Sequence, residues 1–298
     1  MGLLLKREIR VKQFGFINVD KPSGVTSSAI VNKIKWLSGV PCGHMGTLDP
    51  LASGVLPVGV GNATRLFDYF LEKEKEYIAD FTFGVDSDTL DSTGNLVQGG
   101  HVPNETEIEG VLPTLVGGVM QIPPKYSAKN VNGRRGYDLA RAGIEFELAP
   151  KKVIIHSIEL LGKKEDTEDT YLFKIRCGGG TYIRSIARDM AAALGTKAVM
   201  SGLRRTQSGI FTLQNAIPFD VLEKDPSIEE LEQYLIPTDS VLPFETLPLT
   251  DQEVGRILQG QRVKTDMVGG VYKMYTADGF YGLVEVVDGL AKAKTKLC

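Results

Sequence analysis

The stretch GHMGTLDPLASGVLPVGVGNATRL, residues 43–66, contains five glycines and two prolines in 24 residues. So much glycine and proline leaves little room for regular structure and predicts a loop whose backbone makes close approaches. Asp49 is the only acidic residue of the stretch, and Pro50 fixes the backbone beside it. A single carboxylate in a shaped loop that also carries His44 and Arg65 is a candidate nucleophile or general base. An ordinary Asx turn before a proline gives the same pattern, so both interpretations stay open at this point.

Regular elements are predicted on both sides of this loop. Upstream, residues 26–37 place apolar side chains at helical spacing, with Thr26 as the cap and Gly39 just beyond. Downstream, apolar and polar residues alternate from Glu76, which predicts a strand with one apolar face. That face carries Tyr77, Ala79, Phe81 and Phe83.

The rest of the first 236 residues mixes strands and helices without a regular βαβ repeat. Further strands are predicted at residues 153–161 and 171–178, and further helices at residues 134–143 and 183–195. We therefore expect an α+β fold with a mixed β-sheet.

A proline-rich segment, IPTDSVLPFETLPLT, divides the chain and predicts a linker at residues 237–250. This places a catalytic domain at residues 1–236 and a second domain at residues 251–298. In the second domain, Thr250 to Glu253 forms a capping box ahead of a helix.

Two hairpins follow in this second domain. Asp278-Gly279 and Asp288-Gly289 are type I′ turn signals, so we expect a small β-rich module. Its last strand places three lysines on one face, and these either contact RNA or protect an edge strand from aggregation. They are Lys292, Lys294 and Lys296.

Composition narrows the function classes. Thirty-four Lys and Arg against 37 Asp and Glu give a net charge of −3, which argues against a uniformly basic nucleic-acid coat. The charges are clustered, however, and residues 176–205 hold six basic side chains against one acidic one. A fold that gathers the basic segments makes a positive cleft on an acidic body.

Metal, anchor and nucleotide sites find little support. The three cysteines are an odd number without a CxxC pair, and the three histidines are widely dispersed, so we expect no metal and no cofactor. The start, MGLLLKREIR, has no long apolar core, and the longest uncharged stretch is too short for a bilayer, which predicts a cytoplasmic protein without a membrane span. Residues 59–64 resemble the dinucleotide-binding motif GxGxxG but end in threonine, which argues against a dinucleotide site. Asp86, Asp88 and Asp91 resemble a calcium loop, but Leu90 interrupts it, and we interpret this run as a solvated turn.

Two basic clusters remain. In RCGGGTYIRSIARDM, residues 176–190, three glycines lead into a helix with Arg184 and Arg188 one turn apart, which can deliver an arginine to a carboxylate or phosphate. In KYSAKNVNGRRGYDLAR, residues 125–141, basic residues alternate with Tyr126 and Tyr137, as in proteins that bind looped RNA. Surface arginines and buried tyrosines are the alternative interpretations.

Taken in order, these motifs resemble the bacterial tRNA pseudouridine-55 synthases. The match runs through VDKPSGVTSS, GHMGTLDPLASGVLPVGVGNATR, KEY, QIPPKYSAKNVNGRRGYDLAR, GGGTYIRSIARDM and LRRTQSGIF. It covers nearly all of residues 14–215, and GTLDPLA followed by GTYIRS is very specific. The resemblance implies a mixed-sheet pseudouridine synthase domain with a small PUA-like RNA-binding module at the C-terminus.

The resemblance also implies residue roles. Asp49 is the expected catalytic carboxylate, Tyr77 is expected to stack on the target base and help remove its C5 proton, and Arg184 is expected to pair with Asp49. We expect Arg184 to keep the pKa of Asp49 low despite burial. The expected substrate-binding residues are Tyr182 and Leu203 in the pocket, His44 in the space left by flipped bases, and Arg65, where many members have lysine.

The implied reaction converts a uridine at position 55 in the T loop of tRNA to pseudouridine, with the base flipped out of the RNA. The expected partner is the T arm of tRNA, with no obligate protein partner, and the protein is expected to be a monomer. Three alternatives stay open: a guide-RNA-dependent synthase acting on ribosomal RNA, a non-catalytic tRNA-binding or folding factor, and a glycosidase. The last typically needs a second carboxylate near the first.

Overall fold

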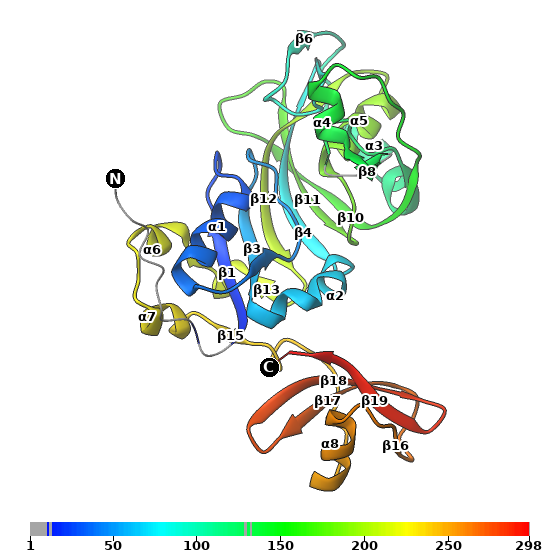
Figure 1. The fold of residues 1–298 in the computed structure, drawn as a ribbon. Coiled ribbons are helices and arrows are strands. Elements are labelled where there is room, and N and C mark those ends of the chain that lie inside the picture. Colours follow the sequence, from blue (N-terminus) through cyan, green and yellow to red (C-terminus); the bar gives the residue numbers. More distant parts are fainter. Residues whose placement is uncertain (1–10, 12–13, 128–129, 132, 298) are drawn as a thin grey trace.

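A computed structural model describes residue 11 and residues 14–127, 130–131 and 133–297 of the chain. The predictions for the first ten residues and for Cys298 lie outside these described residues. Figure 1 shows a large twisted sheet with helices packed around it and, beyond β15, a smaller sheet formed by the end of the chain.

The large sheet is mixed, as predicted, and contains both antiparallel and parallel pairs. Its described strands are β1 (Gly15–Lys21), β2 (Cys42–His44), β3 (Ser53–Val60), β4 (Lys75–Phe83), β7 (Gly117–Gln121), β10 (Lys151–Lys163), β11 (Thr170–Cys177), β12 (Ala198–Ser208), β13 (Phe211–Thr212), β14 (Ile217–Pro218) and β15 (Ile236–Pro237). The main path runs β14-β1-β3-β12-β4-β11-β10-β7. The pairs β1–β14 and β3–β12 are parallel, and the other pairs are antiparallel.

Strand β4 confirms the predicted alternation. Its odd-numbered side chains from Lys75 to Phe83 are buried, and its even-numbered ones are half-buried. On the half-buried face, Glu76 and Asp80 form ion pairs with lysines of neighbouring segments. The sheet therefore has an apolar face toward the core and a charged face toward solvent, which is why the sequence alternates.

The described helices are α1 (Ser27–Ser38), α2 (Phe67–Leu71), α3 (Glu105–Val111), α4 (Gly136–Arg141), α5 (Ile183–Ala193), α6 (Phe219–Glu223), α7 (Ile228–Gln233) and α8 (Asp251–Leu258). Three 3₁₀ turns accompany them: η1 (Gly61–Leu66), η2 (Leu112–Leu115) and η3 (Leu213–Asn215). Helix α1 begins and ends as predicted, because the Thr26 hydroxyl accepts from the Ala29 N–H and Gly39 takes the left-handed conformation with φ 70°. The buried faces of α1 and α5 share one apolar core with the sheet.

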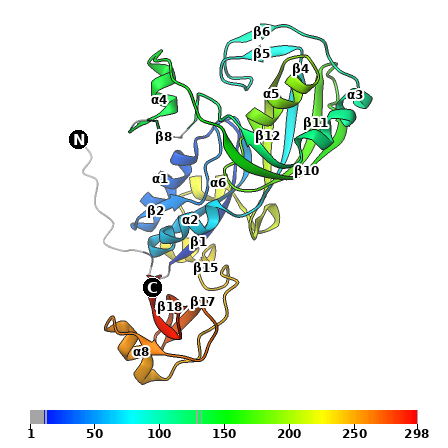
Figure 2. The same cartoon turned by 90° about the vertical axis from the view of Figure 1, so that its right-hand side faces the viewer.

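Two small hairpins project from this domain, as Figure 2 shows for the first of them. They are β5 (Val85–Ser87) with β6 (Leu96–Gln98) and β8 (Asn130–Val131) with β9 (Arg134–Arg135). The helix predicted to start at Arg134 starts instead at Gly136. The reason is that Arg134 and Arg135 pair with Val131 and Asn130 across a tight turn.

The C-terminal module is β-rich, as predicted. Its strands β16 (Val263–Lys264), β17 (Gly270–Thr276), β18 (Gly279–Val287) and β19 (Leu290–Lys296) form a sheet in the order β16-β19-β18-β17. The turn at Asp288-Gly289 has positive φ at both residues, 51° and 71°, as type I′ requires. The type I′ prediction is wrong at Asp278-Gly279, where positive φ occurs at Gly279 and not at Asp278.

The proline-rich segment is packed rather than freely extended. Ile236 and Pro237 pair with β1, Val241 and Leu242 are buried, and Thr246 bridges to Lys273 of β17. The apolar cluster that holds Val241 and Leu242 also contains Phe16 of β1 together with Leu283 and Leu297 of the C-terminal module. Tertiary contacts therefore join the module to the large sheet. Over the described range, the structure contains no helix with the length and apolar character needed to cross a membrane.

Candidate active site

The loop that carries Asp49 is held from several sides. The Ser27 hydroxyl of α1 donates to the Leu48 carbonyl at 2.8 Å and accepts from the Leu48 N–H at 2.9 Å. Lys21, fully buried at the end of β1, donates from Nζ to the Pro50 carbonyl at 3.2 Å. Burial lowers the pKa of Lys21 to about 8. These contacts fix the backbone on both sides of Asp49.

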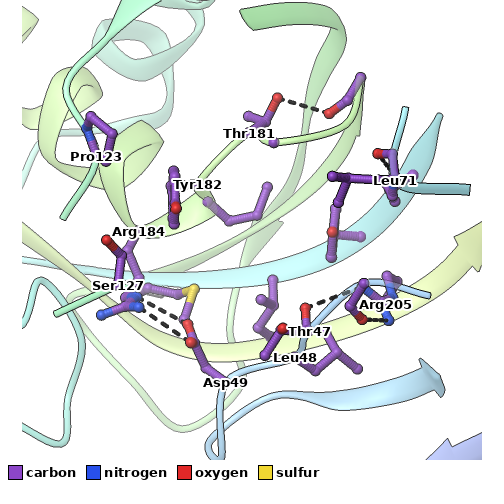
Figure 3. A pocket seen from close by; sticks show the side chains of 18 of the residues that line it. Thr47, Leu48, Asp49, Leu71, Pro123, Ser127, Thr181, Tyr182, Arg184 and Arg205 are labelled. Carbon is purple, nitrogen blue, oxygen red and sulfur yellow. Dashed lines mark hydrogen bonds and ion pairs between the residues drawn. The ribbon is translucent and has the colours of Figure 1, made fainter. Parts of the chain in front are cut away.

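Arg184, in the first turn of α5, forms a two-pronged ion pair with Asp49. Its Nε lies 3.0 Å from Oδ2 and its Nη2 lies 3.2 Å from Oδ1, and Figure 3 shows both contacts as dashed lines. The arginine is 5% exposed and also donates to the carbonyls of Thr89 and Tyr126, each at 3.0 Å. A planar guanidinium that is satisfied on all sides is a rigid partner for the carboxylate.

The pKa of Asp49 moves in the direction opposite to our expectation. Burial raises the pKa of this carboxyl above its usual range, and the charge of Arg184 opposes that effect without cancelling it. Asp91 adds to the increase, while Lys21 opposes it. The expectation of a low pKa was wrong because it let the charge of Arg184 outweigh the burial and left out the second carboxylate.

That second carboxylate, Asp91, corrects the prediction of a solvated turn. It is 5% exposed, and its Oδ2 lies 3.4 Å from Nη1 of Arg184. Its Oδ1 accepts from the Thr89 hydroxyl at 2.8 Å and from the Thr93 N–H at 3.0 Å. The sequence signal was present in TLDST, because a threonine on each side of an aspartate can satisfy a buried carboxylate.

A cavity of about 410 Å³ opens beside the ion pair. Several predicted residues line it, namely Asp49, Tyr77, Tyr182, Arg184 and Leu203. The other lining residues are Gly46, Thr47, Leu48, Phe67, Leu71, Lys75, Pro123, Ser127, Lys151, Gly178, Gly180, Thr181, Ile183, Met200 and Arg205. The β4, α5, β12 and Asp49 segments, far apart in the sequence, thus meet around one space, as Figure 3 shows.

Tyr77 forms part of the cavity wall and is 7% exposed. Burial raises the pKa of its phenol, so the group is protonated at neutral pH. Its cross-strand neighbour Arg205 lies on β12, is 1% exposed, and donates to the carbonyls of Val55 at 2.7 Å and Gly46 at 3.0 Å. Sequence analysis did not single out Arg205, which ties the start of the Asp49 loop to the strand beside Tyr77.

His44 and Arg65 are not among the described residues that line the cavity. His44 lies in β2 with Nε2 3.4 Å from the Thr47 hydroxyl, and burial lowers the pKa of its ring. Arg65 donates to the Lys296 carbonyl at 2.8 Å, so it contacts the C-terminal module and not Asp49. Within the described part of the chain, no group of three or more potential metal-ligating residues gathers at one place.

Two family models match the chain. One is described as "TruB family pseudouridylate synthase (N terminal domain)" and matches residues 35–183. The other is described as "tRNA pseudouridylate synthase B C-terminal domain" and matches residues 184–243. The chain belongs to the TruB family of pseudouridylate synthases. The two TruB models meet between Ile183 and Arg184, at the first turn of α5, and residues 251–298 lie beyond both.

Curated TruB relatives cover most of the chain. "tRNA pseudouridine synthase B" of Synechocystis sp. is 41% identical over 84% of this chain and 85% of its own length. The protein of the same name from Acaryochloris marina is 38% identical over 95% of this chain and 98% of its own length.

A solved structure described as "Crystal Structure of a Cbf5-Nop10-Gar1 Complex" is also similar. It superposes with a TM-score of 0.65 at 28% identity, over 92% of this chain and 79% of that one. This chain therefore combines the TruB sequence motifs with a pseudouridine synthase fold.

The described residues of the basic cluster 125–141 lie beside the cavity, which Ser127 lines. Tyr126 contacts Tyr137 edge to face, with ring centroids 6.4 Å apart, and the Arg141 guanidinium lies 4.4 Å from the centre of the exposed Tyr137 ring. Arg188, the second arginine of α5, pairs with Asp189 at 2.7 Å and donates to the Ile122 carbonyl at 3.1 Å. Of the two α5 arginines, Arg184 is therefore the one that meets the cavity carboxylate.

Proposed function

We propose that this chain converts a uridine of tRNA to pseudouridine, at position 55 of the T loop. The observation that carries the proposal is the ion pair of Asp49 with Arg184 on the wall of a cavity that also holds Tyr77. The names of the curated relatives support tRNA as the substrate. The T-loop position rests on the motif resemblance.

The reaction needs a carboxylate, a closed space and no electron transfer. The N1–C1′ bond of the nucleotide breaks, the uracil turns in place, C5 joins C1′ and loses its proton, and N1 takes up a proton. Asp49 in its ionised form can attack C1′, attack C6 of the ring or remove the C2′ proton, and in each route it acts as the base or nucleophile. Because its pKa is raised, its carboxylate is also more basic than an exposed aspartate.

Arg184 and Tyr77 take complementary roles in this proposal. Arg184 holds both oxygens of Asp49 and so fixes the direction of attack. Tyr77 offers a ring face on which the flipped uracil can stack. Because its phenol is protonated, the hydroxyl can accept the C5 proton only if it gives up its own proton in the same step. Tyr182 and Leu203 supply further cavity wall.

The tRNA contacts follow from charge and exposure. Lys151 lines the cavity, and the basic cluster of residues 125–141 presents the exposed side chains of Tyr137 and Arg141. A flipped nucleotide leaves its phosphates at the cavity mouth, where basic side chains neutralise them. We propose that His44, Arg65 and the lysines of β19 contact the tRNA outside the cavity.

Three alternatives fit the molecule less well. A glycosidase needs a second free carboxylate, but Asp91 is 5% exposed, is bonded to threonines and does not line the cavity. A pure tRNA-binding factor needs no carboxylate paired with an arginine on a cavity wall. A guide-RNA-dependent synthase is less favoured, because this chain matches curated proteins named "tRNA pseudouridine synthase B" at 38–41% identity over most of its length.

We further propose a cytoplasmic monomer that acts without an obligate protein partner and without a metal or cofactor. The support for this part of the proposal is that Asp49, Tyr77 and Arg184, to which we assign the chemistry, line one cavity and all come from a single chain.

The test is to incubate the purified protein with unmodified tRNA transcript and map pseudouridine site by site. We expect one new pseudouridine, at position 55, and none in a transcript with cytidine at that position. Pseudouridine at another site would overturn the T-loop assignment, and binding without any pseudouridine would favour the binding-factor alternative.

A further inference from the structure

Helix α5 brings Arg184 to the cavity, yet its start lacks a cap of its own. The residue at the N-cap position is Tyr182, with extended φ and ψ of −100° and 111°, and its side chain makes no capping hydrogen bond. Ser, Thr, Asp or Asn usually fills this position and satisfies the free N–H groups of the first turn. The segment before it, Gly178–Gly180, cannot fix the helix start by conformational preference, because glycine restricts its backbone least.

Gln121, 61 residues earlier in the chain, instead holds the backbone of Tyr182 itself with its side-chain amide. Its Oε1 accepts from the Tyr182 N–H at 2.8 Å, and its Nε2 donates to the Tyr182 carbonyl at 3.1 Å. Gln121 is 2% exposed and lies at the end of β7, where it pairs with Lys151 of β10. A buried amide that uses both ends on one residue's backbone fixes the position and the rotation of that residue together.

The segment after Gln121 runs along the same helix turn. The Ile122 carbonyl accepts from the Ser185 hydroxyl at 3.0 Å, and the Tyr126 carbonyl accepts from Nη2 of Arg184 at 3.0 Å. Pro123 and Pro124 lie between them, are buried, and restrict the backbone of the segment. The helix start is therefore anchored on one short segment that leads into the basic cluster of residues 125–141.

The position of this helix start sets the position of Arg184. Arg184 is two residues beyond Tyr182, and the Tyr182 carbonyl accepts the first helical N–H groups, those of Ser185 at 3.1 Å and Ile186 at 3.2 Å. A rotation of this turn moves the guanidinium away from Asp49. Reactions of this kind lose about 10²-fold in rate when a group is misplaced by about 1 Å.

We propose that Gln121 is a positioning residue of the isomerase: its amide fixes Tyr182, the N-cap residue of α5, and so holds Arg184 in register with Asp49. The proposal rests on the proposed function for its effect on rate. The effect of Gln121 on the position of the helix start is argued only from its hydrogen bonds to Tyr182.

The test compares three variants of the full chain. Gln121→Met keeps the length and volume of the side chain but removes both hydrogen bonds. Gln121→Glu keeps an acceptor for the Tyr182 N–H and loses the amide donor. Thr196→Val is the matched control, because it removes a buried hydrogen bond beyond the other end of α5, from the Thr196 hydroxyl to the His101 carbonyl at 2.6 Å.

We expect Gln121→Met to slow single-turnover tritium release from C5-labelled tRNA by ~10–100-fold, with tRNA affinity within about threefold of the unmodified protein. Gln121→Glu should recover part of the lost rate. The acid limb of the pH–rate profile should also move to higher pH in Gln121→Met. The charged groups that set the pKa of Asp49 are Arg184, Asp91 and Lys21, and a displaced Arg184 stops lowering it.

A second readout does not depend on activity. Amide hydrogen exchange at Tyr182 should be faster in Gln121→Met and unchanged in Thr196→Val. If the unmodified protein forms no pseudouridine, the proposed function fails, and this exchange measurement still decides the role of Gln121. Wild-type rate, acid limb and exchange in a folded Gln121→Met variant would overturn the inference, and so would an equal loss of rate in Thr196→Val.

Discussion

Asp91→Asn is the substitution that probes the site most sharply, because it changes one charge in a nearly unchanged shape. Oδ1 of Asp91 accepts hydrogen bonds from Thr89 and Thr93, and Oδ2 faces Nη1 of Arg184 at 3.4 Å. An asparagine can present its oxygen to only one of these sides. Whichever way the amide turns, its NH₂ group meets another donor, either the Thr93 N–H or the Arg184 guanidinium.

The expected loss of stability follows from that conflict. A buried donor without an acceptor costs about 1–3 kcal/mol, which corresponds to roughly 2–10 °C in the melting temperature of a chain of this size. The maximal rate should fall as well, by ~10–100-fold, because Arg184 loses one of the groups that fix it. Arg184 keeps its bonds to Thr89 and Tyr126, so the ion pair with Asp49 weakens without disappearing.

The pH dependence has a definite sign. Asp49 works as a carboxylate and its pKa is raised, so activity is present above that pKa and is lost as the pH falls through it. The negative charge of Asp91 is one cause of the increase. In Asp91→Asn the acid limb should therefore move to lower pH even though the maximal rate is smaller. This direction is opposite to the one expected for Gln121→Met.

The assay is single-turnover tritium release between about pH 4.5 and 8, with tRNA affinity measured by filter binding and stability by thermal unfolding. Asp86→Asn is the matched control, because Asp86 lies in the same hairpin but its side chain is 46% exposed and pairs with Lys197 on the surface. We expect that control to keep its rate and to lose at most ~1 kcal/mol. An acid limb in Asp91→Asn that stays in place or moves upward would refute the electrostatic argument.

Three further predictions concern the catalytic residues and the C-terminal module. Asp49→Asn should abolish pseudouridine formation while tRNA affinity by filter binding stays within about tenfold, since phosphate contacts supply most of the affinity; substantial residual turnover would contradict the role of Asp49. Tyr77→Phe keeps the stacking face and should slow tritium release by ~10²–10⁴-fold, whereas an unchanged rate would limit Tyr77 to stacking. Removal of residues 251–298 should weaken tRNA binding, measured against salt, and lower the melting temperature, because Leu283 and Leu297 each contribute about 1.5–3 kcal/mol of apolar burial; a folded truncation with unchanged affinity would exclude the module from RNA binding.

The parts of the fold that the sequence predicts are those decided by neighbours in the chain. The period of two in β4 and the caps of α1 at Thr26 and Gly39 are local properties, and the structure confirms them. The parallel pair of β1 with β14 joins Val19 to Ile217, almost 200 residues apart. No periodicity in either segment indicates that partner, because pairing between distant strands depends on the whole chain being folded.

The site residues also divide into those indicated by their neighbours in the sequence and those that depend on contacts between distant segments. Asp49 stands out in the sequence because glycines and prolines shape the loop around it. Asp91 does not, because its run of acidic and hydroxyl residues is also what a solvated turn looks like. What distinguishes the two cases is burial against Met200 of β12, to which residues 90 and 92 make backbone hydrogen bonds. That contact exists only in the folded chain, and it also explains why the pKa of Asp49 was predicted in the wrong direction.

Arg184 thus depends on two segments in which sequence analysis assigned no catalytic residue. The hairpin segment that includes Asp91 holds the guanidinium from one side, through Oδ2 and the Thr89 carbonyl. The segment that starts at Gln121 holds the helix turn and the guanidinium from another side. A chain could therefore keep GTLDPLA and TYIRS intact and still place its arginine poorly if either segment changed. Because the two segments approach Arg184 independently, we expect the losses of rate from Asp91→Asn and Gln121→Met to add only if each substitution leaves the other anchor in place. A double variant whose loss of rate exceeds the sum of the two single losses would show that either anchor alone holds the ion pair.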